Sequence, residues 1–365
     1  MSKLAILLLL AGFGPAAFAG TRVTVEQIEQ LLSASHGLPD AKLAARISDL
    51  ELTERASSRR LSQWEKDFPG KHTREALLAL ADASAFLDLP RAEIPDLEKP
   101  DPEARKQILD RMVNYVNTTI HKLPNFYARR ATTHFDDLPT LRTNPLHVAD
   151  RTAIIVTYRN GHEVPSRRAY QDREAGSYYA GLTTRGEFGP ILSVVVGDAI
   201  KGRFFWGHWE QGTAGPLAVF RYRVPQENSH YTVTVAENSP FSPAYHGELA
   251  IDPGNGAILR ISVVADLDPS AESDSNPAAV SKSYRPGQTF GAAIEVEYGT
   301  VTIGNAPYIC PQKGVAIWRT IPGGNVLLYP DLGEYNEENV PSQTFVNDVS
   351  FTQYHLFRAD VRILP

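Results

Sequence analysis

Two hydrophobic patterns divide the chain near residue 123. Upstream, apolar residues recur every three or four positions, as in Ile28, Leu31 and Leu32, which is the period of amphipathic helices. Downstream, short runs rich in β-branched and aromatic residues show frequent period-two alternation, which is typical of strands with one buried face. Because these runs follow one another closely, they favour a single antiparallel sheet. The chain is therefore predicted to be an α+β protein.

The N-terminal region, residues 20–88, is predicted to contain four helices. Thr24-Val-Glu-Gln27 has the form of a capping box, in which the Thr hydroxyl and the Gln side chain each satisfy an open backbone N–H. Thr53 is expected to cap the third helix, and the fourth is expected at about 72–87. Such helical arrays more often form packing or docking surfaces than catalytic sites.

Residues 89–101, with three prolines, are predicted to be a linker to the α+β domain, residues 102–365. That domain should begin with a helix over 102–121, because Pro102 suits a first helical turn. A second helix is expected from Pro190. The segments with strand patterns are 125–135, 153–158, 203–209, 217–224, 231–236, 244–251, 257–265, 293–301, 306–310, 314–320 and 346–361.

Two segments of the domain are predicted to be turns or loops. Asp252-Pro-Gly-Asn-Gly256 is typical of a turn, so the strands that flank it should form a hairpin. Residues 268–290 are polar and rich in Ser, Pro and Gly, and are expected to form a long loop.

The first nineteen residues have the parts of a cleavable signal peptide. Lys3 precedes an apolar run, Leu4 to Phe13, and Ala17-Phe18-Ala19 is a cleavage site of small residues. The run is shorter than the ~20 residues that span a bilayer as a helix, which favours cleavage over anchoring. A buried N-terminal helix is the alternative. We expect a periplasmic or secreted protein that begins near Gly20 and has no integral membrane segment after cleavage.

Charge and cysteine content narrow the partners. The chain has 36 Lys and Arg residues against 42 Asp and Glu residues, a net charge of −6. Removal of residues 1–19 takes away only one charge, that of Lys3, and leaves −7. Without a basic block, no nucleic acid or anionic membrane surface is expected as a partner. Cys310 is the sole cysteine, so no intramolecular disulfide can form.

A repeated His-x-Glu pattern is the strongest candidate for chemistry. His208-Trp-Glu210 and His246-Gly-Glu248 both lie in predicted strands, where residues two apart share a face. If the strands are close, two imidazoles and two carboxylates suit zinc or another divalent metal. This would make the chain a metal-dependent hydrolase. The alternative is two polar strand faces without a common site.

Other catalytic patterns give little support for an enzyme. The sequence has no Gly-x-Ser-x-Gly nucleophile elbow and no phosphate-binding glycine loop. Carboxylate pairs of the glycosidase type need no short motif and stay open. No cofactor is predicted, and an enzyme is the less favoured class.

Aromatic residues are spread over successive predicted strands. Phe204 with Trp206, and Phe220 with Tyr222, are pairs two residues apart, so each pair places two rings on one face. They form either a packed core or the lining of a concave cavity for an apolar ligand. The candidate ligand-binding residues are Phe204, Trp206, Phe220, Tyr222, Tyr231, Tyr298, Trp318, Phe351 and Phe357.

The order of these elements resembles the periplasmic lipoprotein-carrier superfamily. The segments that carry the resemblance are the helix 102–121 running into Leu123-Pro-Asn-Phe126, the hairpin Gly247–Arg260, the strand Ile294-Glu-Val-Glu-Tyr298 with Pro307-Tyr-Ile-Cys-Pro311 after it, and the closing Asn347-Asp-Val-Ser-Phe351-x-x-Tyr354-x-x-Phe357.

The resemblance implies a curved antiparallel half-barrel with one or two packed helices. It also implies a hydrophobic ligand, namely a lipid, an acyl chain or an acylated protein. The helical region 20–88 and the loop 268–290 are additions to that plan. The preferred interpretation is a non-enzymatic exported protein that binds such a ligand or an envelope partner. A structural interaction module is the remaining alternative.

Overall fold

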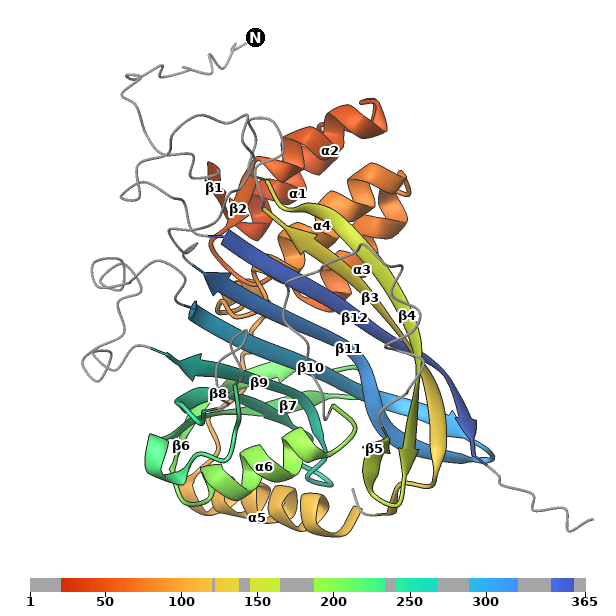
Figure 1. The fold of residues 1–365 in the computed structure, drawn as a ribbon. Coiled ribbons are helices and arrows are strands. Elements are labelled where there is room, and N and C mark those ends of the chain that lie inside the picture. The colour runs from red at the N-terminus through yellow and green to blue at the C-terminus, as the bar shows by residue number, and fades with distance from the viewer. Residues whose placement is uncertain are drawn as a thin grey trace, which may run out of the picture.

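The computed structural model describes residues 21–119, 122–137, 145–164, 187–233, 241–267, 289–320 and 343–357. The expected signal peptide and most of the expected loop 268–290 lie outside the described residues. The described part is α+β, as predicted. Ten of its strands form one curved antiparallel sheet that is not closed into a barrel, with helices on both faces (Figure 1).

Residues 21–88, here called the helical module, have a hydrophobic core of their own. The capping box is confirmed: Gln27 N donates to Thr24 Oγ1 at 3.2 Å, and Thr24 N donates to Gln27 Oε1 at 2.8 Å. The elements of the module are β1 (Thr21–Val23), α1 (Val25–Ser33), α2 (Asp40–Ser48), β2 (Leu50–Leu52), α3 (Ser58–Asp67) and α4 (Lys71–Ala83).

The prediction that Thr53 caps the third helix is wrong. Helix α3 begins at Ser58, and the residues before Thr53 form β2, which pairs in parallel with β1. Thr53 continues this pairing, since its N–H donates to Val23 O at 2.9 Å. This contact joins residues that are 30 positions apart, so no local sequence pattern predicted it.

The large sheet is an antiparallel meander of its later strands, and its three earlier strands extend it at one side. Its order is β5-β4-β3-β12-β11-β10-β9-β8-β7-β6. The strands are β3 (Phe126–Asp136), β4 (His147–Arg159), β5 (His162–Val164), β6 (Arg203–Gln211), β7 (Pro216–Val224), β8 (Ala244–Ile251), β9 (Ile258–Asp266), β10 (Thr289–Ile303), β11 (Ala306–Thr320) and β12 (Gln343–Leu356).

The predicted hairpin of β8 and β9 is confirmed, and two strand predictions need correction. The segments 306–310 and 314–320 are one strand, β11, whose register shifts at Pro311 without a break in pairing. Of the predicted strand 231–236, the described residues make only an isolated bridge between Val233 and Phe241. The sequence around Pro311 looks like the end of a strand, but in the structure it is a bulge within β11.

Two helices cover one face of the β6–β10 half, here called the apolar face. Helix α5 (Pro102–Thr119) contributes Met112 and α6 (Pro190–Ala199) contributes Val195 to a core that also contains Phe220 and Tyr245. Gly256, at φ 80°, ends the β8–β9 turn directly against α5, where a Cβ would lie 2.4 Å from the Arg111 backbone. The glycine therefore allows the helix to approach the hairpin.

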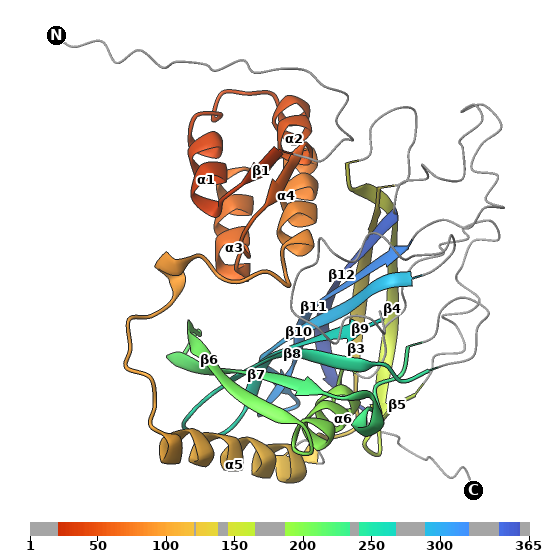
Figure 2. The ribbon, with the colours of Figure 1, turned by 90° about the vertical axis from the view of Figure 1, so that its left-hand side faces the viewer.

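The helical module packs on the opposite face, here called the charged face. In Figure 2 the module stands above strands β6–β8, and α5 and α6 lie below them. Ala79 and Ala85 contact Val315 and Ile317 of β11, on the side of the sheet opposite to the α5 core. The segment 89–101 holds a single 3-10 turn, η1 (Arg91–Glu93), and another turn, η4 (Gln226–Asn228), follows β7. No helix in the described residues is long and apolar enough to cross a membrane.

Candidate functional site

Strand alternation separates apolar from charged side chains on this half of the sheet. Along β10, Ile294 and Val296 point into the α5 core, while Glu295 and Glu297 face the helical module. The same period of two places Ile261 in the core and Arg260 on the charged face. Acidic and basic residues from five neighbouring strands therefore meet under the module.

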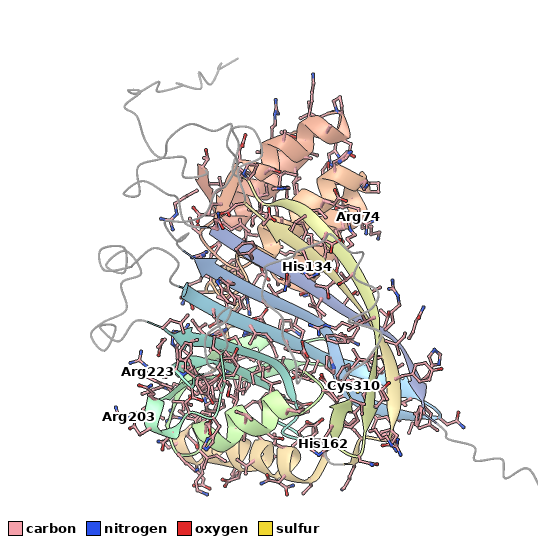
Figure 3. All side chains as sticks on the ribbon, viewed as in Figure 1. Arg74, His134, His162, Arg203, Arg223 and Cys310 are labelled. Carbon is pink, nitrogen blue, oxygen red and sulfur yellow. The ribbon has the colours of Figure 1, made fainter. Side chains whose placement is uncertain are left out.

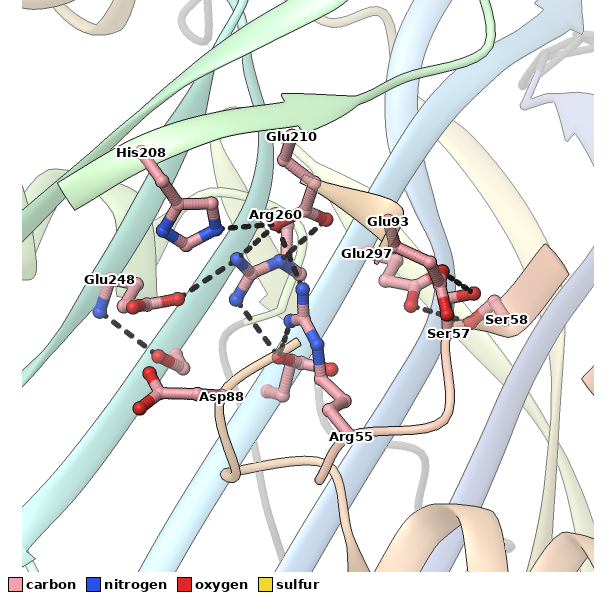
Figure 4. A network of polar contacts seen from close by, with 12 residues as sticks. Arg55, Ser57, Ser58, Asp88, Glu93, His208, Glu210, Glu248, Arg260 and Glu297 are labelled. Atoms are coloured by element: carbon pink, nitrogen blue, oxygen red, sulfur yellow. Dashed lines mark hydrogen bonds and ion pairs between the residues drawn. The ribbon is translucent and has the colours of Figure 1, made fainter. Parts of the chain in front are cut away.

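Arg260 lies at the centre of a buried ion-pair network (Figure 4). Its Nη2 is 2.7 Å from Glu210 Oε2 and 3.0 Å from Glu248 Oε2, and its Nη1 is 3.1 Å from Glu295 Oε2. One guanidinium thus binds carboxylates from β6, β8 and β10. A buried arginine with three partners is held in one geometry, because its fork of donors is rigid.

Arg55 brings a second guanidinium from the helical module. Its Nη2 is 2.8 Å from Glu210 and its Nη1 is 3.4 Å from Glu295. It lies in the loop between β2 and α3, and its backbone N–H donates to Asp88 O at 2.8 Å. The network of Arg55, Glu210, Glu248, Arg260 and Glu295 therefore ties the module to the sheet.

The carboxylates of this network differ in pKa. Burial alone would raise the pKa of Glu210, but Arg260 and Arg55 together lower it to about 2. Burial alone would raise the pKa of Glu248 too, but Arg260, Arg55 and Arg221 together lower it. Glu295 behaves differently: its complete burial, with Glu297 and Glu210 nearby, raises its pKa despite the two arginines. Glu210 and Glu248 are thus firmly ionised at neutral pH.

The predicted metal set at His208, Glu210, His246 and Glu248 is only half assembled. Glu210 and Glu248 do converge, but on the Arg260 guanidinium. His246 turns away, with Nδ1 2.9 Å from Asp266 Oδ1, and His208 Nε2 lies 3.9 Å from Glu210. Within the described part of the chain, no group of three or more His, Cys, Asp or Glu side chains has a geometry suited to a metal ion. The cation of this site is arginine.

A second buried cluster lies deeper between α4 and β11. Lys313 Nζ is 2.6 Å from Asp82 Oδ1 and 3.7 Å from Asp348 Oδ1. Burial raises the pKa of Asp82 to about 7, even though Lys313 opposes the change. This cluster borders a cavity of about 40 Å³ between module and sheet, with room for ~3 waters. It is too small for an organic ligand.

A larger cleft opens beside the network, with a volume of about 530 Å³. One wall is the end of the helical module, residues 85–88, and the other is the charged face of β6–β9. This volume falls within the ~300–1,000 Å³ of small-molecule sites. Arg260 borders both the cleft and the smaller cavity, so the network forms the partition between them.

Two further arginines, Arg203 and Arg223, border the cleft. Arg203 on β6 is directly opposite Arg223 on β7 in the strand pairing, and Figure 3 labels the two near each other at the lower left of the molecule. Among the described residues neither forms an ion pair, and both are exposed. Like charges directly opposite each other destabilise a sheet. The next residue across the sheet in this row is His246, whose Nδ1 lies 2.9 Å from Asp266 Oδ1.

The nine aromatic residues of the predicted ligand site lie in different parts of the described structure. Phe220, Tyr222 and Tyr298 are buried in the α5 core, and Phe204, Trp206 and Tyr231 pack against it. Phe351 belongs to a separate core at the β3–β12 end, Trp318 is buried elsewhere in the sheet, and Phe357 is exposed. Of the nine, Tyr222 alone borders the described cleft. The bulky rings fill the space that helices α5 and α6 close, because protein cores pack to crystal-like density.

The arginines of the cleft were missed from the sequence. Arg221 and Arg223 stand two residues apart on one strand, which by itself is typical of a solvated strand face. The short β6–β7 turn does not give this register by itself, because the pairing shifts by one residue at a bulge between Trp206 and Trp209. Only this shift brings Arg203 opposite Arg223, and no sequence pattern predicted it.

Comparison with known proteins adds no family to this geometry. No model of a protein family matches the chain, and neither the curated proteins nor the solved structures contain a significant match.

Proposed function

We propose that this chain is a non-enzymatic exported protein that binds a ligand with an anionic head and an apolar portion. The binding site is the cleft between residues 85–88 and strands β6–β9. The ligand class stays close to the acylated molecules expected from the sequence. The site moves from the aromatic face to the charged face, because the rings of the aromatic face are packed.

The observation that carries the proposal is the Arg203–Arg223 pair. Two arginines directly opposite each other, without an ion-pair partner in the described residues, repel one another in the free protein. An anion placed between them removes this repulsion and accepts charge-assisted hydrogen bonds from both. The pair is therefore more stable with an anion than without one.

The rim of the cleft supplies apolar surface beside these charges. Phe205 on β6 is 52% exposed and Leu87 of the module is 40% exposed, and both border the cleft together with Phe86. A large exposed aromatic ring next to a basic pair suits a molecule that is charged at one end and apolar at the other. A small inorganic anion would leave this surface uncovered.

The carboxylates of the site favour binding over hydrolysis. A general base works best with a pKa near the working pH. The pKa of Glu210, held at about 2 by its two arginines after the opposing effect of burial, is far from that range. Glu210 and Glu248 serve as fixed counter-ions of Arg260 and Arg55, which makes them structural.

Calorimetric titration with decanoate below its micelle concentration tests the proposal. We expect binding to the wild type, and at least tenfold weaker binding to the double variant Arg203→Gln/Arg223→Gln, since hydrogen bonds to charged groups contribute about 1.5–3 kcal/mol each. The matched control is Arg46→Gln/Arg159→Gln, which removes two exposed arginines far from the cleft. Binding should also weaken as NaCl is raised, because exposed charges are screened.

Two results would count against this function. One is equal affinity of the wild type and the Arg203/Arg223 double variant for decanoate. The other is equal affinity of the wild type for decanoate and for decyltrimethylammonium, which has the same chain and the opposite charge. Either result would show that the arginine pair does not select the ligand.

A further inference from the structure

A third arginine, Arg221, borders the cleft, and an acidic side chain of the helical module pairs with it. Arg221 lies two residues from Arg223 on the same face of β7 and directly opposite Phe205. Its Nε donates to Glu248 Oε1 at 3.1 Å, and its Nη2 contacts the carboxylate of Asp88. Arg221 therefore differs from Arg203 and Arg223 in having two acidic partners.

Asp88 is anchored by its main chain and not by its side chain. Its carbonyl accepts the Arg55 N–H at 2.8 Å, so the backbone position is tied to the buried network. Its side chain is 80% exposed, and within the described residues its contact is with Arg221. The carboxylate can thus turn into water without disturbing the module, and an exposed pair of this kind holds weakly.

Building on the proposed function, we propose that Asp88 is an internal competitor for the ligand head. We further infer that the preferred head is a phosphate monoester, which binds Arg203 and Arg223 and displaces Asp88 from Arg221. The Asp88 carboxylate marks a position in the cleft where an anionic oxygen group is already accepted. The ligand head takes over that position.

The number of guanidiniums favours phosphate over carboxylate. A carboxylate has two oxygens, enough for the Arg203–Arg223 pair. A phosphate monoester has three acceptor oxygens and a charge of about −1.5 to −2 at neutral pH, enough for a third arginine as well. Glu248 does not compete for the head, because it is held between Arg221 and Arg260. The three arginines come from two adjacent strands, about 4.8 Å apart, so their long side chains converge on one head group.

Titration of the whole chain with three probes tests this inference: decyl phosphate, decanoate and inorganic phosphate. In the wild type we expect decyl phosphate to bind about tenfold more tightly than decanoate. Asp88→Asn should strengthen decyl phosphate binding about two- to fivefold, as expected for release of an exposed ion pair, and leave decanoate nearly unchanged. Asp49→Asn, an exposed aspartate elsewhere on the module, is the matched control and should change neither.

Arg221→Gln gives the complementary readout. It should abolish the preference for decyl phosphate over decanoate, because it weakens decyl phosphate binding more than decanoate binding. Inorganic phosphate should bind much more weakly than decyl phosphate, because it cannot cover Phe205 and Leu87. Equal affinity for inorganic phosphate and decyl phosphate would assign the site to free phosphate and would contradict an amphiphilic ligand.

These outcomes distinguish a failure of the Asp88 inference from a failure of the proposed function. If decanoate binds through Arg203 and Arg223 but Asp88→Asn fails to strengthen decyl phosphate binding, the competitor role of Asp88 is wrong and the proposed function stands. If neither amphiphile binds the wild type, both fail together.

Discussion

The two faces of the β6–β10 sheet are built from the same strands, but they differ in what contacts their side chains. On the apolar face, side chains such as Phe220 and Tyr245 are buried in a core that α5 and α6 cover. On the charged face, Arg260 and its carboxylates are covered by the helical module, while the arginines beside them border an open cleft.

This difference shows where a binding function can reside. Apolar side chains pack without direction, so a helix can fill the space above them completely. Buried charged side chains need partners in fixed positions, and exposed like charges opposite each other repel in the free protein. The charged face contains both cases: Arg260 has three acid partners, and the Arg203–Arg223 pair has none among the described residues.

The largest effect is expected from removal of the central charge. Arg260→Met leaves three carboxylates facing one another around Arg55, and loss of one partner of a buried pair costs about 3–5 kcal/mol of unfolding free energy. Urea unfolding followed by circular dichroism measures it. Arg203→Met is the contrast and should be neutral or slightly stabilising, because it removes the repulsion opposite Arg223. A loss below about 1 kcal/mol in Arg260→Met would break the distinction between the two kinds of arginine.

A slightly smaller loss is expected on the apolar face. Phe220→Ala should lower the free energy of unfolding by about 3 kcal/mol, the low end for a buried Phe, because the half-buried Trp206 and Trp209 can settle into part of the gap. Phe205→Ala, on the neighbouring strand and the other face, should change it by less than about 0.5 kcal/mol. Similar losses in the two variants would show that Phe205 is packed and not free for a ligand.

A third effect is expected from pH. The pKa of Asp82 is raised by burial to about 7, from an ordinary value of 3.8. A raised pKa means that the folded state holds a proton that the unfolded state releases, so stability should fall as pH rises from about 4 to 7. Asp348, across Lys313, also has a pKa raised by burial, so it contributes to the fall with the same sign.

The urea midpoint between pH 4.5 and 7.5 measures this slope. Glu210, whose pKa is lowered, acts with the opposite sign, but its contribution is lost only as pH falls below about 4.5 toward 2. Asp82→Asn should flatten the slope, and the exposed Asp49→Asn should leave it unchanged. A slope that persists in Asp82→Asn would assign it to another buried acid, such as Glu295, whose pKa is also raised.

The repeating elements of the fold were readable from local sequence. Thr24 and Gln27 predicted the first helix, and Asp252-Pro-Gly-Asn-Gly256 predicted the β8–β9 hairpin. Both features depend on contacts between residues that are only a few positions apart. Elements that depend on distant partners were not readable. The strand Leu50–Leu52 exists because Thr21–Val23 lies beside it, and neither segment has a pattern that names the other.

The candidate site followed the same division. Alternation correctly placed Glu210 on one face of its strand and Glu248 on one face of its own, and the two do meet. The identity of their partner was beyond a sequence pattern, because Arg260 comes from β9 and Arg55 from the helical module. A pair of His-x-Glu motifs therefore suggested a metal where the protein uses guanidinium.

The sequence by itself determined the α+β class, most of the helices and strands, and which residues share a face along stretches of strand without a bulge. These depend on period and on turns, which act over a few residues. Only the tertiary structure decided that the aromatic face is filled, that the carboxylates belong to Arg55 and Arg260, and that Arg203 and Arg223 remain without acid partners in the described chain. These are properties of packing and of charge partners brought from up to 240 residues away, and no local pattern records them.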